Sequence, residues 1–296
     1  MSTPPALTLP PNARRIEIPV TRGSRAAIEL SPRDPVGTAV LVPGFTGSKE
    51  DFLSLLQPLA DCGWRVVAYD QLGQWHSPGP PDPAAYSLDL LGADARDVVA
   101  WAATTPGHDV HLVGHSLGGL VARAAVLDAD CTDATSLTLL CSGPGALPEH
   151  RRGAIPALVS VLPDMPMNEI WQVKEHMDRE AGGELPPPEI QTFLRERFCA
   201  ASPWGLRIMG EILLTEPDRT PALAAAGVAV HVVYGEHDDA WPLNDQDSMA
   251  DALGATVHVI ANAGHSPAVD DPVATADTLD RLWRASRSGG QDSPLL

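Results

Sequence analysis

The amino-acid sequence predicts an α/β fold, with a mostly parallel, doubly wound sheet that is interrupted by a helical insertion. Short apolar runs alternate with helix-like stretches over residues 38–141, and the alternation returns over residues 228–285. This rhythm is typical of parallel sheets, because a crossover between parallel strands needs a long connection, usually a helix. Between the two blocks, residues 144–215 contain no apolar run that resembles a buried strand.

The first block predicts the following elements in order. Two partly alternating segments separated by Thr-Arg-Gly-Ser indicate a hairpin. Apolar runs ending at Pro, Asp or Gly indicate buried strands, and apolar residues at helical spacing indicate crossover helices. Strands are expected at residues 15–20, 25–30, 38–42, 65–70, 109–114 and 136–141, and helices at 49–60, 87–103 and 116–127.

The rest of the chain is divided in the same way. Strands are expected at residues 228–235 and 256–260, helices near 244–253 and 271–285, and helix-like stretches at 166–180 and 188–200 inside the insertion. Residues 1–12 form a loose Pro-rich leader. The expected organisation is a core in two parts, 1–143 and 219–285, with an insertion at 144–218 and a flexible polar tail at 286–296.

Composition excludes several classes of function. The chain has 296 residues, with 38 acidic and 20 basic side chains and a formal net charge of −18. Such a charge repels nucleic acid and anionic membranes, so we expect neither as a partner. No secretory signal and no apolar stretch approaching ~20 residues is seen, which favours a cytoplasmic location. The four cysteines lack metal-ligand spacing, so buried free thiols and no metal are expected.

The strongest local motif is Gly-His-Ser-Leu-Gly-Gly at residues 114–119, which matches G-x-S-x-G. A nucleophile on a sharp strand-to-helix turn needs strained backbone angles, and side chains two residues on either side would clash. An apolar strand precedes the motif and an apolar helix follows it, as such a turn requires. The helix points its positive dipole end at the reaction centre. We therefore predict that Ser116 is a nucleophile; the alternative is a small residue in a tight turn.

A serine hydroxyl needs a general base to become reactive. His265 lies directly after the expected strand at 256–260 and before the last helix. Loops that leave the carboxyl ends of parallel strands are where open α/β sheets form their sites. His265 is therefore the predicted base. His115 flanks the nucleophile and would be badly aimed as a base, but it is a candidate for the pocket wall.

The base needs an acid that fixes its tautomer and balances its charge. After the strand at 136–141 no acid occurs until Glu149, whereas Gly235 is followed by Glu-His-Asp-Asp. Asp238 is therefore the predicted acid, and Asp239 and Glu236 remain alternatives. The reaction also needs two N–H donors for an oxyanion. We expect these donors to be the backbone amides of Leu117 and, in the loop after residue 42, Phe45; the alternative for the Phe45 ring is a hydrophobic plug.

Four motifs in this order resemble those of the α/β-hydrolase superfamily. They are Pro-Gly-Phe-Thr-Gly-Ser at 43–48, the turn at 114–119, the acid loop at 235–242, and Gly-His-Ser-Pro at 264–267. The order Ser, acid, His is the order of that superfamily. Two departures are Pro43, where many relatives have His, and Gln74, which replaces a common Gly. The resemblance implies that residues 144–218 are a cap that shapes the pocket.

The resemblance implies acyl transfer by a Ser-His-Asp triad without a cofactor. A small carboxylic ester or lactone is the expected substrate. Cleavage of C–C or amide bonds, or haloperoxidase-like perhydrolysis, is the alternative on the same triad, and a non-catalytic ligand-binding role is a third. The oligomeric state is left open. The residues expected to bind substrate, which equally fit the core of the cap or loop, are His115, Trp171, Trp204 and Trp241.

Overall fold

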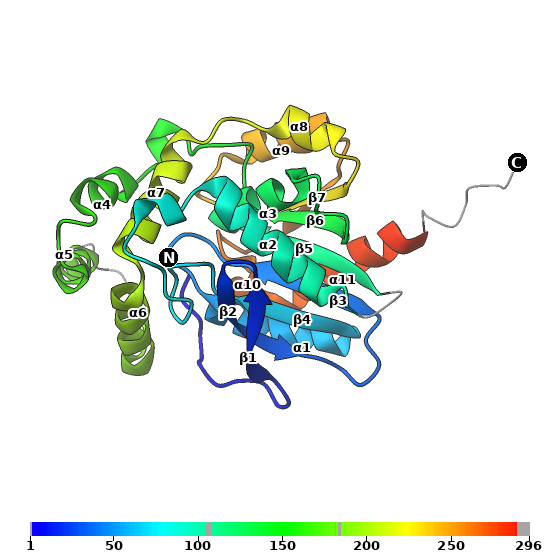
Figure 1. The fold of residues 1–296 in the computed structure, drawn as a ribbon, viewed down its shortest axis with the longest axis horizontal. Coiled ribbons are helices and arrows are strands. Elements are labelled where there is room, and N and C mark those ends of the chain that lie inside the picture. The colour runs from blue at the N-terminus through cyan, green and yellow to red at the C-terminus, as the bar shows by residue number, and fades with distance from the viewer. Residues whose placement is uncertain (1, 105–107, 181, 183–184, 289–296) are drawn as a thin grey trace, which may run out of the picture.

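The computed structural model describes residues 2–104, 108–180, 182 and 185–288. Its centre is an eight-stranded sheet with the order β1-β2-β4-β3-β5-β6-β7-β8 (Figure 1). The pairs β1–β2 and β2–β4 are antiparallel, and all other neighbouring pairs are parallel. The predicted α/β fold with a mostly parallel sheet is therefore confirmed.

The elements follow the expected alternation on both sides of the insertion. The strands are β1 Arg14–Val20, β2 Gly23–Leu30, β3 Gly37–Val42, β4 Trp64–Tyr69, β5 Asp109–His115, β6 Ala134–Leu140, β7 Ala229–Gly235 and β8 Val257–Ile260. The α-helices are α1 Leu53–Asp61, α2 Leu88–Ala102, α3 Leu117–Leu127, α4 Ile155–Val161, α5 Met167–Glu180, α6 Pro188–Ala200, α7 Pro203–Thr215, α8 Thr220–Ala225, α9 Leu243–Leu253, α10 Pro267–Asp270 and α11 Pro272–Ser288. Short 3-10 helices are η1 Lys49–Phe52, η2 Pro83–Ala85 and η3 Glu149–Arg151.

The central strand β3 shows why the sheet is covered on both faces. All six of its residues are buried, and successive side chains of a strand point to opposite faces. Val40 and Val42 join the apolar core that contains residues of α2, α3 and α9, whereas Ala39 and Leu41 join the core that contains residues of α1 and α11. A run whose only polar side chain is the buried Thr38 thus places the strand between two helical layers.

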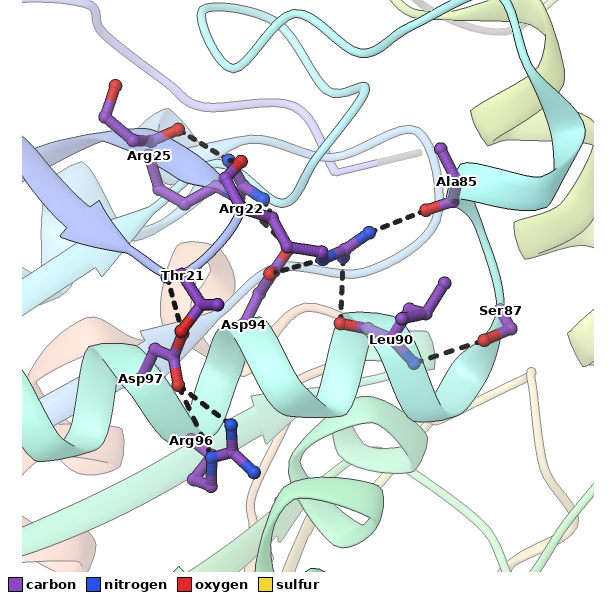
Figure 2. A network of polar contacts seen from close by, with 10 residues as sticks. Thr21, Arg22, Arg25, Ala85, Ser87, Leu90, Asp94, Arg96 and Asp97 are labelled. Carbon is purple, nitrogen blue, oxygen red and sulfur yellow. Dashed lines mark hydrogen bonds and ion pairs between the residues drawn. The ribbon is translucent and has the colours of Figure 1, made fainter.

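The antiparallel edge is fastened to the helical layer by ion pairs. Figure 2 shows that Arg22, in the β1–β2 turn, and Arg25, in β2, both reach Asp94 of α2. Arg22 also donates to the carbonyl oxygens of Ala85 and Leu90, so its guanidinium spans the segment that leads into α2. Asp94 is buried and binds two cations, which fixes the hairpin against α2.

The segment between β6 and β7 is helical, and in Figure 1 its helices α4, α5 and α6 lie to one side of the sheet. The expected stretches at 166–180 and 188–200 correspond to α5 and α6. Helices α4 and α7 were not predicted; α7 begins with Pro203, capped by Ser202. Residues of α5, α6 and α7 share an apolar cluster of their own. The boundaries 144 and 218 stay predictions.

The ends of the chain differ from expectation. The leader is not free, because the carbonyl oxygen of Ser2 accepts a hydrogen bond from Arg197 of α6 and Leu7 packs against the cluster of the inserted helices. The last helix continues to Ser288, beyond the predicted end at 285. The rest of the predicted flexible tail, 289–296, lies outside the described residues. Within the described part of the chain, no helix is both long and apolar enough to cross a membrane.

Candidate active site

Ser116 lies on the sharp turn between β5 and α3, with φ 56° and ψ −123°. Few L-residues adopt such angles, and a strained residue of this kind needs its surroundings to hold it. A Cβ on Gly114 would lie 2.2 Å from the carbonyl oxygen of Gly118, and a Cβ on Gly118 would lie 2.3 Å from that of Val42. The glycines of the motif are therefore required by close main-chain packing, as the sequence predicted.

His265 follows β8 and is bound to Asp238, which follows β7. The His265 Nδ1 and Asp238 Oδ1 atoms are 2.7 Å apart. The Asp238 side chain is fully buried, whereas 26% of the His265 side chain is exposed. The remaining oxygen, Oδ2, accepts a hydrogen bond from Gln246 of α9, and Oδ1 also accepts one from the Ala240 N–H. Both carboxylate oxygens of the buried acid are thus satisfied.

The electrostatics keep this acid ionised. Burial alone raises the pKa of Asp238, but hydrogen bonds and charge attraction from His265, with hydrogen bonds from Ala240 and Gln246, leave the pKa below its ordinary value. The carboxylate fixes the His265 ring, because a bond at Nδ1 leaves Nε2 as the nitrogen able to accept a proton.

The two alternative acids do not contact His265 in this way. Glu236 is exposed and accepts a hydrogen bond from the Asn262 N–H, and Asp239 is exposed.

His115 joins the turn of Ser116 to the loop of His265. Its Nε2 lies 2.6 Å from the carbonyl oxygen of His265, and the two rings are 5.0 Å apart between centroids. A carbonyl only accepts, so Nε2 carries the proton and donates. Burial, with repulsion from His265, lowers the pKa of His115 to about 3. His115 is therefore a neutral support for the loop of His265.

The two predicted oxyanion donors lie beside the nucleophile. Leu117 is the first residue of α3, so its N–H has no partner within the helix. A Cβ on Gly44, the residue before Phe45, would lie 3.1 Å from the Ser116 Cβ. The Phe45 ring packs against both the core and the cluster of the inserted helices. A Cβ on Gly210 of α7 would lie 3.5 Å from the Phe45 Cζ atom. Within the described residues, neither the Phe45 N–H nor the Leu117 N–H has a hydrogen-bond acceptor.

The predicted pocket residues are placed in several surroundings. Trp171 is buried in the cluster of the inserted helices, beside Phe198. Trp241 is also buried, and its Nε1 donates to the carbonyl oxygen of Gly145. Trp204 is half-buried, with the Arg207 guanidinium over its ring. The contact of any of them with substrate stays a prediction, as it does for His115.

Sequence reasoning missed Cys141. Its Sγ and the ligand atoms of Asp238 and His265 lie within 4.8 Å of one another, and its backbone has a φ of 48°. Burial raises the pKa of the Cys141 thiol well above its ordinary value, so the group is a neutral thiol beside the acid. The available signal was position, because Cys141 directly follows β6 and the carboxyl ends of parallel strands gather at one edge.

Sequence reasoning also missed the residues that hold the loop of Phe45. Gln71 and Gln74, after β4, donate from their side-chain amides to the carbonyl oxygens of Pro43 and Gly44. Both glutamines are buried. Gln74 was noted only as a departure from the superfamily pattern, and no signal in the sequence shows which carbonyl a distant amide will reach.

Comparisons with known proteins identify the family of the chain. The model of the alpha/beta hydrolase family matches residues 39–278. A protein provisionally named carbamate hydrolase RutD, from Variovorax paradoxus strain S110, is 42% identical over 278 residues, covering 86% of this chain and 94% of its own length. A 2-succinyl-6-hydroxy-2,4-cyclohexadiene-1-carboxylate synthase from Enterobacter sp. strain 638 is 28% identical, covering 83% and 91%.

Solved structures show the same fold. An esterase from Exiguobacterium antarcticum superposes with a TM-score of 0.72 at 19% identity, covering 90% of this chain and 98% of its own. Identity at that level supports the fold alone, whereas the family model spans most of the chain. The chain is therefore a member, and an enzyme, of the alpha/beta hydrolase family.

Proposed function

We propose that this protein is a serine hydrolase that cleaves a small carboxylic ester or lactone through an acyl-enzyme. The observation that carries the proposal is the 2.7 Å bond between His265 Nδ1 and the buried carboxylate of Asp238, on loops that meet the strained turn of Ser116. An imidazole aligned by a buried, ionised acid is what a serine hydroxyl needs to lose its proton near neutral pH.

In this mechanism the Ser116 Oγ attacks the carbonyl carbon, and its proton passes to His265 Nε2. The carbonyl oxygen becomes an oxyanion that accepts hydrogen bonds from the N–H groups of Phe45 and Leu117. His265 then gives the proton to the leaving alcohol oxygen, and the acyl group stays on Ser116. Water, deprotonated by His265, attacks the ester so formed, and His265 returns the proton to the Ser116 Oγ as the acid is released. Asp238 remains ionised throughout and stabilises the imidazolium.

Features of the sequence and of the inserted helices favour a small substrate. The sequence contains no long apolar run of the kind that would suggest an interfacial lid for long lipids. The inserted helices pack their apolar residues against one another and against the Phe45 ring, which favours a small acyl group. A cyclic ester suits the same chemistry. The only difference is that the leaving alcohol stays attached to the acyl group after the ring opens.

Labelling with a fluorophosphonate probe tests the nucleophile. We expect the full chain to lose its esterase activity as one probe molecule attaches, and peptide mass spectrometry to place the adduct on Ser116. The Ser116→Ala variant should fold normally and remain unlabelled. If the wild-type protein neither reacts with the probe nor hydrolyses short p-nitrophenyl esters, the proposal is wrong.

A second candidate, hydrolysis of a carbamate or amide-type bond, is favoured by the 42% identical relative named as a carbamate hydrolase. The same triad would act on it, because Ser116 attacks the carbonyl carbon in the same way. An amide then releases an amine or ammonia, whereas a carbamate ester releases its alcohol and leaves a carbamoyl group on Ser116. A panel that pairs each ester with the carbamate of the same alcohol distinguishes the two. A higher kcat/KM for carbamates than for their matched esters would assign the second activity instead.

A further inference from the structure

The side chain of Gln74 holds the peptide group that carries the proposed oxyanion donor of the β3–η1 loop. Gln74 Nε2 donates to the carbonyl oxygen of Gly44 at 2.9 Å. Gln74 is only 2% exposed, so water cannot easily replace this bond. The Gly44 carbonyl accepts a second hydrogen bond, from the Gly47 N–H at 3.1 Å, which closes the turn around Phe45.

The orientation of the amide follows from its two neighbours. Gln74 Oε1 faces the backbone N–H of Gln71 at 3.2 Å, and a backbone N–H can only donate. The oxygen of Gly44 can only accept, so the amide nitrogen must lie on that side. Exchanging the oxygen and nitrogen of Gln74 would place its NH2 group against the Gln71 N–H, donor against donor. It would also place its oxygen against the Gly44 carbonyl oxygen, acceptor against acceptor. The hydrogen bond to Gly44 therefore has one possible direction.

The Gly44 carbonyl and the Phe45 N–H belong to one planar peptide. Among the described residues the only cis peptide is Leu162–Pro163, so the Gly44–Phe45 peptide is trans, and its C=O and N–H point in opposite directions. Fixing the carbonyl toward Gln74 therefore fixes the N–H away from it. Because Gly44 has no side chain, this peptide plane is freer to rotate than most, and it needs an external anchor.

We propose that Gln74 is a positioning residue for the oxyanion hole: its amide locks the Gly44–Phe45 peptide with the Phe45 N–H available, and polarises it. A carbonyl that accepts a hydrogen bond makes the N–H of the same peptide group a stronger donor. This inference rests on the proposed function, because it assumes that the Phe45 N–H receives the oxyanion. Gln74 itself touches no reacting atom.

The test compares two near-isosteric variants, Gln74→Glu and Gln74→Met. Glutamate fills the same space but presents an oxygen to the Gly44 oxygen when ionised, and methionine presents no donor. A lost oxyanion donor costs roughly 10²–10³ in kcat, so a misplaced one should cost about 10- to 100-fold in kcat with little change in KM. We expect the affinity for an alkyl trifluoromethyl ketone, which forms a tetrahedral adduct on Ser116, to fall in parallel with kcat/KM.

Gln71→Met is the matched control. Gln71 is equally buried in the same loop and also bonds a carbonyl, but that carbonyl is Pro43, whose peptide carries the Gly44 N–H instead of the Phe45 N–H. We expect its unfolding free energy to fall about as much as that of Gln74→Met, while its kcat/KM and its ketone affinity fall by a smaller factor than those of Gln74→Met, because the Gly44–Phe45 peptide keeps its own anchor.

The outcomes separate the inference from the proposed function. If both Gln74 variants lose kcat but keep wild-type ketone affinity, or if both keep full kcat, Gln74 does not position the donor. If Gln74→Met fails to fold, the Gln74→Glu variant alone decides by the same ratio of ketone affinity to kcat/KM. Failure of the wild-type protein to react with a fluorophosphonate at Ser116 would instead reject the proposed function.

Discussion

Two neighbouring turns meet at the candidate active site, and they are held in different ways. The turn of Ser116 is shaped by main-chain packing, since Gly114 lets β5 approach the start of α3 and Gly118 lets α3 approach the end of β3, at distances that a Cβ would block. The loop at 43–49 is instead held by side chains from distant segments. The glycines that permit close main-chain packing can be recognised in the sequence motif. Side-chain contacts between distant segments depend instead on which segments the fold brings together.

The side-chain fastening of the loop at 43–49 comes from both the core and the inserted helices. Asp51 accepts from the Ser48 N–H and from Arg197 of α6, at 2.5 Å for the guanidinium. Asp70, after β4, accepts from both the backbone N–H and the side chain of Lys49. These charged groups are buried, so the loop depends on a polar network that water cannot replace.

The largest effect on kcat is expected from the Asp238 carboxylate, which aligns the proposed general base His265. Asp238→Asn keeps the shape of the acid loop but removes the charge that aligns His265, so we expect kcat to fall by about 10³- to 10⁴-fold. Asp239→Asn, one residue along and exposed, should change kcat by less than about twofold. Steady-state kinetics on a short p-nitrophenyl ester measure both, and the opposite ranking would reassign the acid.

The next effect breaks the fastening of the loop at 43–49. Arg197→Met leaves the buried carboxylate of Asp51 without its cation, and removing one partner of a buried ion pair costs about 3–5 kcal/mol. Equilibrium unfolding in urea measures this loss of stability. The double variant Asp51→Asn/Arg197→Met removes both charges and should recover part of it. If the double variant is less stable than Arg197→Met, the penalty does not come from the unpaired carboxylate.

A smaller effect is expected from breaking the main-chain fastening of the turn. Gly118→Ala places a Cβ 2.3 Å from the carbonyl oxygen of Val42, and β3 or α3 must shift to relieve it. Overpacking of this kind costs about 1–3 kcal/mol. Gly264→Ala is the control, because its Cβ would meet Asp270 Oδ2 at an ordinary 3.5 Å. Equal unfolding free energies for the two variants would show that the turn tolerates a side chain.

The same difference explains what the sequence could predict. The fold followed from apolar runs and helical spacing, and Ser116 followed from glycines within two residues of it. His265 and Asp238 were predicted because each follows a strand, and strand ends gather at one edge of a parallel sheet. Gln74 and Arg197 could not be predicted, because their roles depend on contacts 30 and 146 residues away along the chain.

Helices α4 and α7 show another limit of the sequence. Both begin with a proline in the first turn, and α4 has no fully buried residue. A short helix without a buried stripe gives little periodicity to detect, which explains why α4 was missed. Helix α7 buries Leu206, Met209 and Leu213, so its apolar spacing was a signal that the sequence analysis overlooked. The insertion was therefore correctly predicted to be helical, but its individual helices were only partly located.

The smallest effect concerns His115, which belongs to the turn of Ser116 but supports the loop of His265. Burial holds the pKa of His115 at about 3, against an ordinary value of 6.5. Between these values the unfolded chain binds more protons than the folded protein, so stability rises with pH across this window and is lost as the pH falls below 6.5. The contribution of His115 is at most about 1.4 kcal/mol per pH unit.

His115→Gln removes this titration and keeps an N–H donor for the carbonyl of His265. We expect the unfolding free energy of the wild type, relative to that of the variant, to fall as the pH is lowered from 6.5 to 4.5. Burial raises the pKa of Asp70, which gives a slope of the opposite sign in the same range, so the informative quantity is the difference between the two curves. A difference that stays constant from pH 6.5 to 4.5 would mean that His115 titrates normally in the folded protein, and that the turn and the loop of His265 are not joined through a buried neutral imidazole.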